Sequence, residues 1–311
     1  MRIVFMGTPN AAVPSLERLL SDGHDVAAVY TQPDRPSGRG NKIVFSAVKE
    51  FAFEKGIPVL QPLKIRIPEA LDEFRSLAAE AAVVVAYGRI LPETFLKAFP
   101  NGAINVHFSL LPKYRGAAPV NWAIAGGEKE TGVTTMQMDA GLDTGPILLQ
   151  RTVKIGAKET AIELMDRLSD LGADLLANTL SGLKDIEPQT QDHANASLAP
   201  LMRREDGLID WDMMAKAISD RVRGFQPFPT MFTVNGGLRL TIWKAFPYTE
   251  SNDCESKPGH VLLAKGDDLL VGCGEGTILR IEELQPEGKR RMTTRDFLNG
   301  VKLSADDLFG R

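Results

Sequence analysis

Cysteine is scarce in this chain, and its scarcity excludes whole classes of protein. The 311 residues contain two cysteines, Cys254 and Cys273. Two such residues form neither a disulfide framework nor the paired spacing of a structural zinc site. The four histidines show no metal-ligand spacing either. We therefore expect a protein of a reducing compartment, the cytoplasm, that needs no metal ion.

Long apolar runs and an excess of positive charge are lacking as well. No run approaches the roughly 18 apolar residues that a membrane span requires. The first residues, MRIVFMG, resemble neither a signal peptide nor a transit segment. The net charge is −4, so any contact with nucleic acid must use a local basic patch. We expect no membrane contact.

The first half of the chain alternates predicted strands and helices. Residues 2–6 read as a strand, residues 13–21 as an amphipathic helix and residues 25–31 as a second strand. This opening implies a parallel, right-handed crossover. The apolar run over 82–86 is typical of a strand that is buried on both faces. The pattern predicts an α/β domain with a doubly wound, mostly parallel sheet.

The pattern changes in the second half of the chain. One helix is predicted over 213–223, and closely spaced short strands with turn signals follow it, which indicates a separate OB-like β-barrel. Residues 184–205 lack periodicity and read as a linker plus a surface-hugging segment. We therefore expect a first domain over 1–189, a linker over 190–204 and a C-terminal β-barrel domain over 205–311.

A central stretch, AINVHFSLLPKYRGAAP, begins where another predicted strand runs out. Alternation along that strand places Asn105, His107 and Ser109 on one face. Val106 and Phe108 point to the opposite face by the same rule. In open α/β sheets the carboxyl ends of the strands are where ligands sit. Three polar groups are therefore expected to converge at a ligand-binding edge.

A glycine-rich loop further along supplies carboxylates. The segment DAGLDTG contains Asp139 and Asp143, and predicted strands over 132–138 and 147–153 flank it. An amide, an imidazole and a carboxylate together suit acyl transfer, in which an oxyanion must be held and a proton moved. The chemistry of the residues alone does not choose between the two aspartates.

A basic segment follows the second predicted strand. Residues 32–42, QPDRPSGRGNK, form a loop by every breaker rule, with two prolines and two glycines. Arg35, Arg39 and Lys42 outnumber the single acid, Asp34. Such a segment is either a solvated surface loop or a contact for phosphate groups.

The motif N-x-H-x-S-L-L-P from Asn105, followed by Asp143, resembles the folate-dependent formyltransferases. The blocks TQPDRPSGRG, VVAYGRILP, SLLPKYRGAAP and TGVTTMQMDAGLDTG and the late IDW extend this resemblance in order over nearly the whole chain. Within the family, they are most similar to the members that act on methionine carried by initiator tRNA. One position departs from the pattern, because Phe108 stands where close relatives usually have glycine.

The resemblance implies a Rossmann-like formyltransferase domain and a specific reaction. A formyl group passes from 10-formyltetrahydrofolate, the co-substrate, to the amino group of methionine on charged initiator tRNA, a step of one-carbon metabolism that serves translation initiation. Asn105 and His107 would donate hydrogen bonds to the developing oxyanion. Asp143 would hold His107 and help to take the proton of the amine. The reaction needs no metal.

The resemblance also assigns the binding segments. The folate-binding residues would be Ser109, Leu110, Leu111 and Pro112 after the central strand, and Tyr87, Gly88, Arg89, Ile90 and Leu91 after the preceding one. The loop with Arg35, Arg39 and Lys42 would contact the acceptor end of the tRNA. The plainer interpretations are an apolar core for the first segment, a helix-start turn for the second and a solvated loop for the third.

Two alternative functions share part of this pattern. A folate-dependent formyltransferase that acts on a small amine, such as glycinamide ribonucleotide or an amino sugar, would need the same amide, imidazole and carboxylate. A binding module for tRNA or folate would need no such set. The basic loop and the additional β domain favour a macromolecular acceptor. We expect the protein to act as a monomer.

Overall fold

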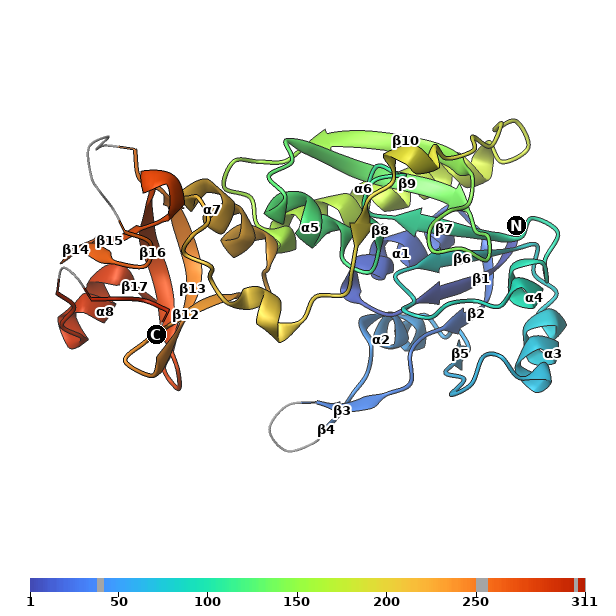
Figure 1. The fold of residues 1–311 in the computed structure, drawn as a ribbon. Helices are drawn as coiled ribbons and strands as arrows, with labels where there is room; N and C mark the ends of the chain where they lie inside the picture. Colours follow the sequence, from blue (N-terminus) through green and yellow to red (C-terminus); the bar gives the residue numbers. More distant parts are fainter. Residues whose placement is uncertain (38–41, 250–256, 305–306, 311) are drawn as a thin grey trace. The chain divides into compact units, whose positions relative to one another are not determined.

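The computed structural model describes residues 1–37, 42–249, 257–304 and 307–310, which form two compact units (Figure 1). Unit 1 comprises residues 1–119, 130–154 and 165–200. Unit 2 comprises residues 120–129, 155–164 and 201–311. No helix among the described residues has both the length and the apolar character to cross a membrane.

Unit 1 is built on a seven-stranded sheet. Its strands are β1 (Arg2–Gly7), β2 (Asp25–Tyr30), β5 (Val59–Leu60), β6 (Ala81–Val85), β7 (Ala103–His107), β9 (Glu130–Gln137) and β10 (Ile147–Lys154). They lie in the order β10-β9-β7-β6-β1-β2-β5, and β9 runs antiparallel to both of its neighbours. The doubly wound, mostly parallel sheet predicted from the sequence is confirmed.

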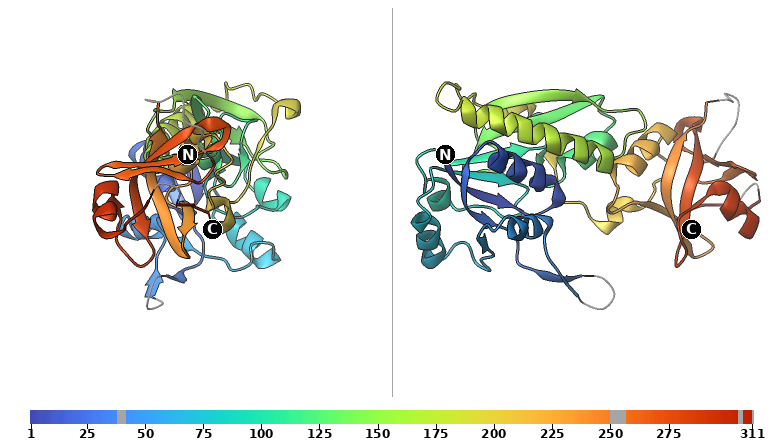
Figure 2. Two further views of the ribbon diagram at one scale, coloured as in Figure 1. Left: turned by 60° about the vertical axis from the view of Figure 1, so that its left-hand side comes forward. Right: turned by 180° about the vertical axis from the view of Figure 1, so that it is seen from behind.

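Helices cover both faces of this sheet (Figure 2). The helices of the chain are α1 (Val13–Ser21), α2 (Ala47–Glu54), α3 (Pro68–Ser76), α4 (Glu93–Leu96), α5 (Pro119–Ala125), α6 (Ala161–Ser181), α7 (Ala215–Gly224) and α8 (Thr294–Gly300). Arg18 of α1 pairs with Asp174 of α6. Phe74 of α3 stacks at 4.7 Å on Phe95 of α4, over buried residues of β1 and β6.

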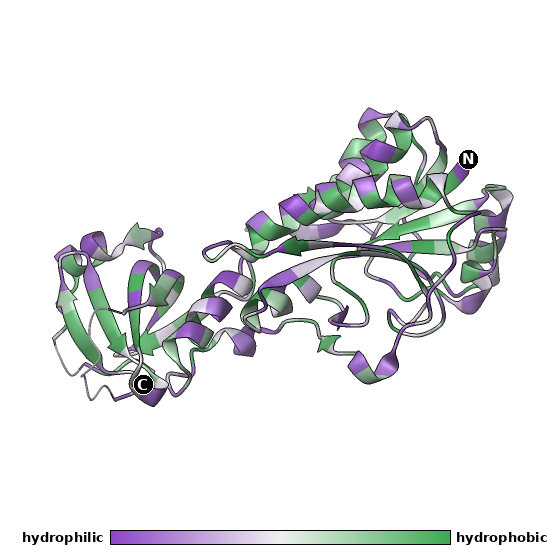
Figure 3. Ribbon diagram, turned by 90° about the horizontal axis from the view of Figure 1, so that it is seen from above, coloured by the Kyte–Doolittle hydropathy of each residue, from purple (hydrophilic) through white to green (hydrophobic). Residues whose placement is uncertain are grey.

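The chain itself signals where these helices begin. Ser46 accepts a hydrogen bond from the backbone amide of Lys49 and caps α2. Thr160 and Glu163 hydrogen bond reciprocally at the start of α6, which is a capping box. Along the ribbon, green apolar residues dominate the inner strands of the sheet, while the helices alternate between green and purple (Figure 3). Amphipathic helices on an apolar sheet bury one face each.

The register of β7 in the sheet confirms that its side chains alternate between the two faces as predicted, as far as its last residue, His107. Asn105 is paired with Val84, whose side chain lies in the core beneath α3 and α4. On the opposite face, a Cβ added to Gly172 of α6 would lie 3.0 Å from Val106 and 3.3 Å from Phe108. The helix approaches the sheet this closely because Gly172 has no side chain.

Two expectations need correction, and part of the expected linker lies within unit 1. Strand β7 ends at His107, so the alternation does not reach Ser109, whose hydroxyl donates to the carbonyl of Lys113. The predicted loop over 32–42 includes the strand β3 (Arg35–Ser37) and the first residue of β4 (Lys42–Val44), and these two strands pair as an antiparallel hairpin. Residues 190–200 of the expected linker belong to unit 1, where β11 (Leu198–Ala199) pairs with β8 (Arg115–Gly116). These contacts join distant segments and leave no periodic signal.

Unit 2 is built on an antiparallel sheet, in agreement with the predicted small β domain. Its strands are β12 (Met231–Asn235), β13 (Leu238–Pro247), β14 (Val261–Lys265), β15 (Asp268–Gly272), β16 (Ile278–Pro286) and β17 (Met292–Thr293). The order is β12-β13-β16-β15-β14, with β17 paired to β16. Gly236 and Gly237 form the turn between β12 and β13. Both residues adopt the positive φ that a tight hairpin turn requires.

Candidate functional site

The carboxyl edge of the seven-stranded sheet collects the predicted site residues. After β1 the chain adds β2 and β5 on one side and then returns to add β6 and β7 on the other. The reversal lies between β1 and β6, which is the position where open α/β sheets form a ligand crevice. Tyr87 follows β6 at this edge, and His107 ends the neighbouring strand β7.

His107 is buried and is held through one ring nitrogen. Its Nε2 lies 3.0 Å from the carbonyl oxygen of Tyr114. A carbonyl oxygen only accepts hydrogen bonds, so Nε2 carries the proton in this contact. The other nitrogen, Nδ1, lies 3.8 Å from Oδ2 of Asp143. This separation exceeds a direct hydrogen bond and leaves Nδ1 facing the carboxylate.

Asp143, rather than Asp139, is the carboxylate beside the imidazole. Its backbone is left-handed, with φ of 51°, and its Oδ2 accepts a 2.8 Å hydrogen bond from the amide of Gly116. Asp139 instead accepts hydrogen bonds from Gly141 and Thr144 within its own turn. Asp139 therefore closes a local turn, whereas Asp143 accepts a hydrogen bond from a strand that is distant in the chain, β8.

Asn105 presents an unused amide beside this pair. It lies on the same face of β7 as His107, two residues before it, and is only 8% exposed. Among the described residues, its side chain has no hydrogen-bond partner within the protein. A buried amide without a partner is costly unless a ligand or water completes it. Asn105, His107 and Asp143 thus form an amide, imidazole and carboxylate cluster.

Two further residues position the Asp143 loop: Arg115 lies within the block SLLPKYRGAAP but was assigned no role there, and Gln191 lies outside every quoted block. Gln191 donates from Nε2 to the carbonyl oxygens of Asp143, at 2.9 Å, and of Gly145, at 2.7 Å. The buried guanidinium of Arg115 in turn donates to Oε1 of Gln191 at 2.6 Å. Gln191 comes from the segment that was expected to be a linker, which is why periodicity did not find it.

The turn after β7 is held by polar residues from β9 and β10. Thr134 donates to the carbonyl of Ser109 at 2.6 Å and accepts from the amide of Leu111 at 3.2 Å. Gln150 donates to the carbonyl of Leu111 at 2.8 Å. The Leu111 side chain is buried in a small apolar cluster. The peptide bond between Leu111 and Pro112 is cis, and Leu110 is half-buried.

The segment from Tyr87 to Leu91 mixes core and surface residues. The side chains of Tyr87 and Leu91 are buried in the core, and burial raises the pKa of the Tyr87 hydroxyl. Gly88 has a positive φ of 79°, and Ile90 is 65% exposed. Arg89 donates to the side chain of Gln32 and to the carbonyls of residues 62 and 63. The backbone turn and Ile90 are the parts of this segment open to a ligand.

The three basic residues expected to contact tRNA are described to different degrees. Arg35 is exposed in β3. Lys42 is described only through its backbone in β4, and Arg39 lies outside the described residues. The antiparallel pairing of Arg35 with Val44 places the start of the hairpin next to α2.

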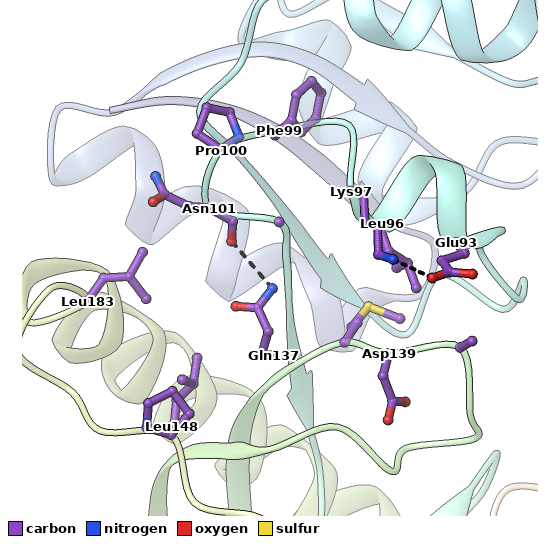
Figure 4. Close-up of a pocket in the computed structure, with 14 residues that line it drawn as sticks. Glu93, Leu96, Lys97, Phe99, Pro100, Asn101, Gln137, Asp139, Leu148 and Leu183 are labelled. Carbon is purple, nitrogen blue, oxygen red and sulfur yellow. Dashed lines mark hydrogen bonds and ion pairs between the residues drawn. The ribbon is translucent and has the colours of Figure 1, made fainter.

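A cavity of about 620 Å³ lies at the opposite end of β7, next to its amino terminus (Figure 4). Its wall includes Gln137, which donates to the carbonyl of Asn101, and the ion pair of Lys97 with Glu93. None of the nine residues expected to bind folate lines this cavity. Its shape therefore gives no support to that set. The described part of the chain contains no cluster of ligating side chains that could hold a metal ion.

Comparison with known protein families matches both parts of the chain. Residues 1–180 match the family described as formyl transferase. Residues 201–302 match the family described as formyl transferase, C-terminal domain.

Two relatives that are similar over nearly their whole length carry the same name. The chain is 50% identical over 305 residues to the methionyl-tRNA formyltransferase of Geobacter metallireducens, covering 97% of this chain and 96% of that protein. It is 50% identical over 312 residues to the methionyl-tRNA formyltransferase of Solibacter usitatus, covering 100% of this chain and 99% of that protein.

Solved structures share the fold at lower identity. A sugar 3N-formyl transferase aligns with a TM-score of 0.68 at 20% identity, over 93% of this chain and 99% of that one. A methionyl-tRNA formyltransferase from Clostridium thermocellum aligns with a TM-score of 0.56 at 18% identity, over 79% of this chain and 92% of that one. At these identities the alignments show a common fold alone.

Proposed function

The chain belongs to the formyl transferase family, and on that premise we propose that it transfers a formyl group from 10-formyltetrahydrofolate to methionine on charged initiator tRNA. The observation that carries this proposal is the 50% identity, over almost the full length of both chains, to proteins named for that activity. The protein would act as a monomer in the cytoplasm and serve translation initiation.

The chemical step is attack of the neutral methionine amine on the formyl carbon. A bond forms between the amine nitrogen and the formyl carbon, and the tetrahedral centre carries negative charge on the former carbonyl oxygen. The carbonyl then re-forms as the bond to the folate nitrogen breaks, and that nitrogen takes up a proton that balances the one lost by the amine. The unused amide of Asn105 is suited to donate a hydrogen bond to that oxygen. Its burial strengthens the contribution, because a hydrogen bond to a charge is worth more away from water.

His107 and Asp143 supply the remaining charge and proton chemistry. With Nε2 occupied by the carbonyl of Tyr114, Nδ1 is the nitrogen that faces the reacting groups. When protonated at Nδ1, the imidazolium donates to the developing oxyanion while Asp143 balances its charge. Oδ1 of Asp143 has no hydrogen bond among the described residues, so it is suited to accept the proton of the amine, directly or through water.

The two substrates would approach this cluster from different segments. Folate would lie along the turn from Ser109 to Pro112 and the segment from Tyr87 to Leu91, chiefly against backbone groups and Ile90. The basic residues Arg35, Arg39 and Lys42 of the segment 32–42 would contact phosphates of the acceptor end. Residues 1–189 would form the catalytic domain and residues 205–311 would help to hold the tRNA. The connecting residues 190–204 would also support the site, since they carry Gln191.

One assay tests this proposal against its main alternative. Purified protein is given labelled 10-formyltetrahydrofolate with charged initiator tRNA, glycinamide ribonucleotide or a nucleotide-linked amino sugar as acceptor. We expect transfer to the charged tRNA to exceed transfer to either small amine by at least about 100-fold in kcat/KM, the discrimination of about 2.7 kcal/mol. Comparable or faster transfer to a small amine would replace the tRNA assignment.

A further inference from the structure

A chain of hydrogen bonds joins the segment assigned to folate with the hairpin assigned to tRNA. Gln32 donates from Nε2 to the carbonyl of Tyr87, at 3.1 Å, and accepts from Nε of Arg89, at 3.1 Å. The backbone carbonyl of Gln32 accepts a hydrogen bond from Nε2 of Gln61 at 2.7 Å. Gln32 therefore holds the folate segment with its side chain and is itself held through its backbone.

Gln61 continues this chain toward the hairpin. Its Nε2 also donates to Oδ1 of Asp34 at 2.9 Å, and its Oε1 accepts from Nζ of Lys49 at 2.8 Å. Lys49 pairs with the other oxygen of Asp34. Both the nitrogen and the oxygen of the Gln61 amide are hydrogen bonded, and Gln61 is linked to the hairpin through Asp34 and to the folate segment through Gln32.

Asp34 and Lys49 hold the base of the hairpin on its two sides. Asp34 immediately precedes β3, and Lys49 lies in the first turn of α2, just after β4. The Lys49 side chain is only 9% exposed, and its ammonium lies 4.0 Å from the ring centre of Phe45. The hydrogen bonds from Lys49 and Gln61 hold the pKa of the Asp34 carboxyl below its usual value. A buried ammonium without this partner would be unfavourable.

The hairpin depends on this base for its orientation. Among the strands that the structure describes, β3 and β4 form a two-stranded sheet of their own and do not pair with the seven-stranded sheet of unit 1. An isolated two-stranded hairpin is marginal in water. Besides the Asp34 contacts, a 2.7 Å hydrogen bond between the hydroxyls of Thr31 and Ser46 closes the base. A change at the folate segment therefore has a direct mechanical route to the hairpin through Gln32 and Gln61.

We propose that Gln61, together with Gln32, Asp34 and Lys49, couples folate binding to tRNA binding. This inference rests on the proposed function, which assigns the two substrates to the two segments. Gln61 is a positioning residue, because it acts through Gln32 and Asp34 and contacts neither Asn105, His107 nor Asp143. When one substrate orders its segment, the free-energy cost of ordering the other segment falls. Folate binding therefore tightens tRNA binding, and tRNA binding tightens folate binding to the same degree.

The test measures the dissociation constant of methionine-charged initiator tRNA with and without saturating tetrahydrofolate, which carries no formyl group and permits no turnover. In the unmodified protein we expect tetrahydrofolate to tighten tRNA binding about fivefold or more. In Gln61→Met we expect this ratio to fall to within about twofold of unity. Saturated kcat should change by less than about twofold, while KM for tRNA rises, because the catalytic cluster is untouched.

Two further variants make the result specific. Gln61→Glu keeps an acceptor for Lys49 but loses both donors, so we expect this variant to lose the coupling as well. It provides the test if Gln61→Met folds poorly. Lys97→Met removes an exposed ion pair on α4 in the same unit, and we expect it to keep the coupling. Thermal melting checks that each variant is folded.

The outcomes separate this inference from the proposed function. A ratio near unity in the unmodified, active protein would overturn the coupling alone, as would a folded Gln61→Glu protein that retains the full ratio. Absence of formyl transfer to charged tRNA in the unmodified protein would overturn the proposed function and the coupling with it.

Discussion

Two aspartates with largely covered side chains, one in each unit, show how differently a carboxylate can be used in this protein. Asp220 of α7 in unit 2 is 5% exposed and accepts from Arg223 at 2.7 Å and from Lys216 at 2.6 Å. Arg223 in turn donates to the carbonyl of Glu159 at 2.6 Å. Every group in this network has a partner, and the network binds α7 to the segment before α6.

Asp143 of unit 1 is left partly unpaired. It is 15% exposed, its Oδ2 accepts from a backbone amide, and the nearest cation-forming group, Nδ1 of His107, stays 3.8 Å away. A closed ion pair holds a fold together, whereas a carboxylate with spare acceptor capacity can take up a proton. The contrast shows that a low exposed fraction does not distinguish the two aspartates, whereas the spare acceptor capacity of Asp143 does.

Of these changes, loss of the ion pair between Asp220 and Arg223 should lower the free energy of unfolding the most. Asp220→Ala leaves the buried guanidinium of Arg223 without its carboxylate, and we expect the free energy of unfolding to fall by about 3–5 kcal/mol. Chemical denaturation measures this change. Turnover by the folded fraction should stay within about twofold of the original value. A variant with unchanged stability would show that the network is dispensable.

Replacement of Asp143 should have the opposite pattern of effects, with a large loss of turnover and little change in stability. We expect Asp143→Asn to lower turnover by about 100-fold or more, equivalent to roughly 2.7 kcal/mol, because an amide can neither accept the proton nor balance an imidazolium. Asn105→Ala and His107→Ala should be similarly severe, with little change in thermal melting. Near-normal turnover in folded Asp143→Asn would transfer the role to another group, and Asp139→Asn would be measured next.

Loss of the support for the Asp143 loop should have an intermediate effect. Gln191→Met removes two donors to the loop carbonyls, and we expect turnover to fall about tenfold, or roughly 1.4 kcal/mol, because the carboxylate is no longer held in place. The matched control is Gln226→Met, since Gln226 is a buried glutamine of unit 2 that also donates to two carbonyls. If both variants lowered turnover equally, the effect of Gln191 would be merely structural.

The smallest effect on stability and turnover is expected at Phe108, which follows β7 and packs against α6 on the side of the sheet away from the site. Phe108→Leu changes apolar packing against α6, so we expect a loss of about 1 kcal/mol in unfolding free energy and no change in turnover. The backbone of Phe108 does not have a positive φ, so the side chain standing where relatives usually have glycine causes no backbone strain. A large loss of turnover without loss of stability would place Phe108 in the folate site.

Local patterns were sufficient for much of the fold and for part of the site. Helix α1 begins and ends at the residues predicted, and β7 places Asn105 and His107 on one face as alternation requires. Ser109 departs from that expectation because the strand stops two residues earlier and its hydroxyl closes a turn. The pairing of β3 with β4 leaves no signal in the sequence, because two three-residue strands next to prolines and glycines are too short to show a period.

The sequence by itself determined the strands, the helices and the residue types available for acyl transfer, because these follow from periodicity and chemistry within short windows. Only the tertiary structure decided how those residues work together. It brought Asp143 rather than Asp139 beside His107, placed Gln191 and Arg115 behind the loop, and joined Gln32 to Lys49 through Gln61. Each of these contacts joins segments that are distant in the chain, and hydrogen bonds between such segments leave no trace in local patterning.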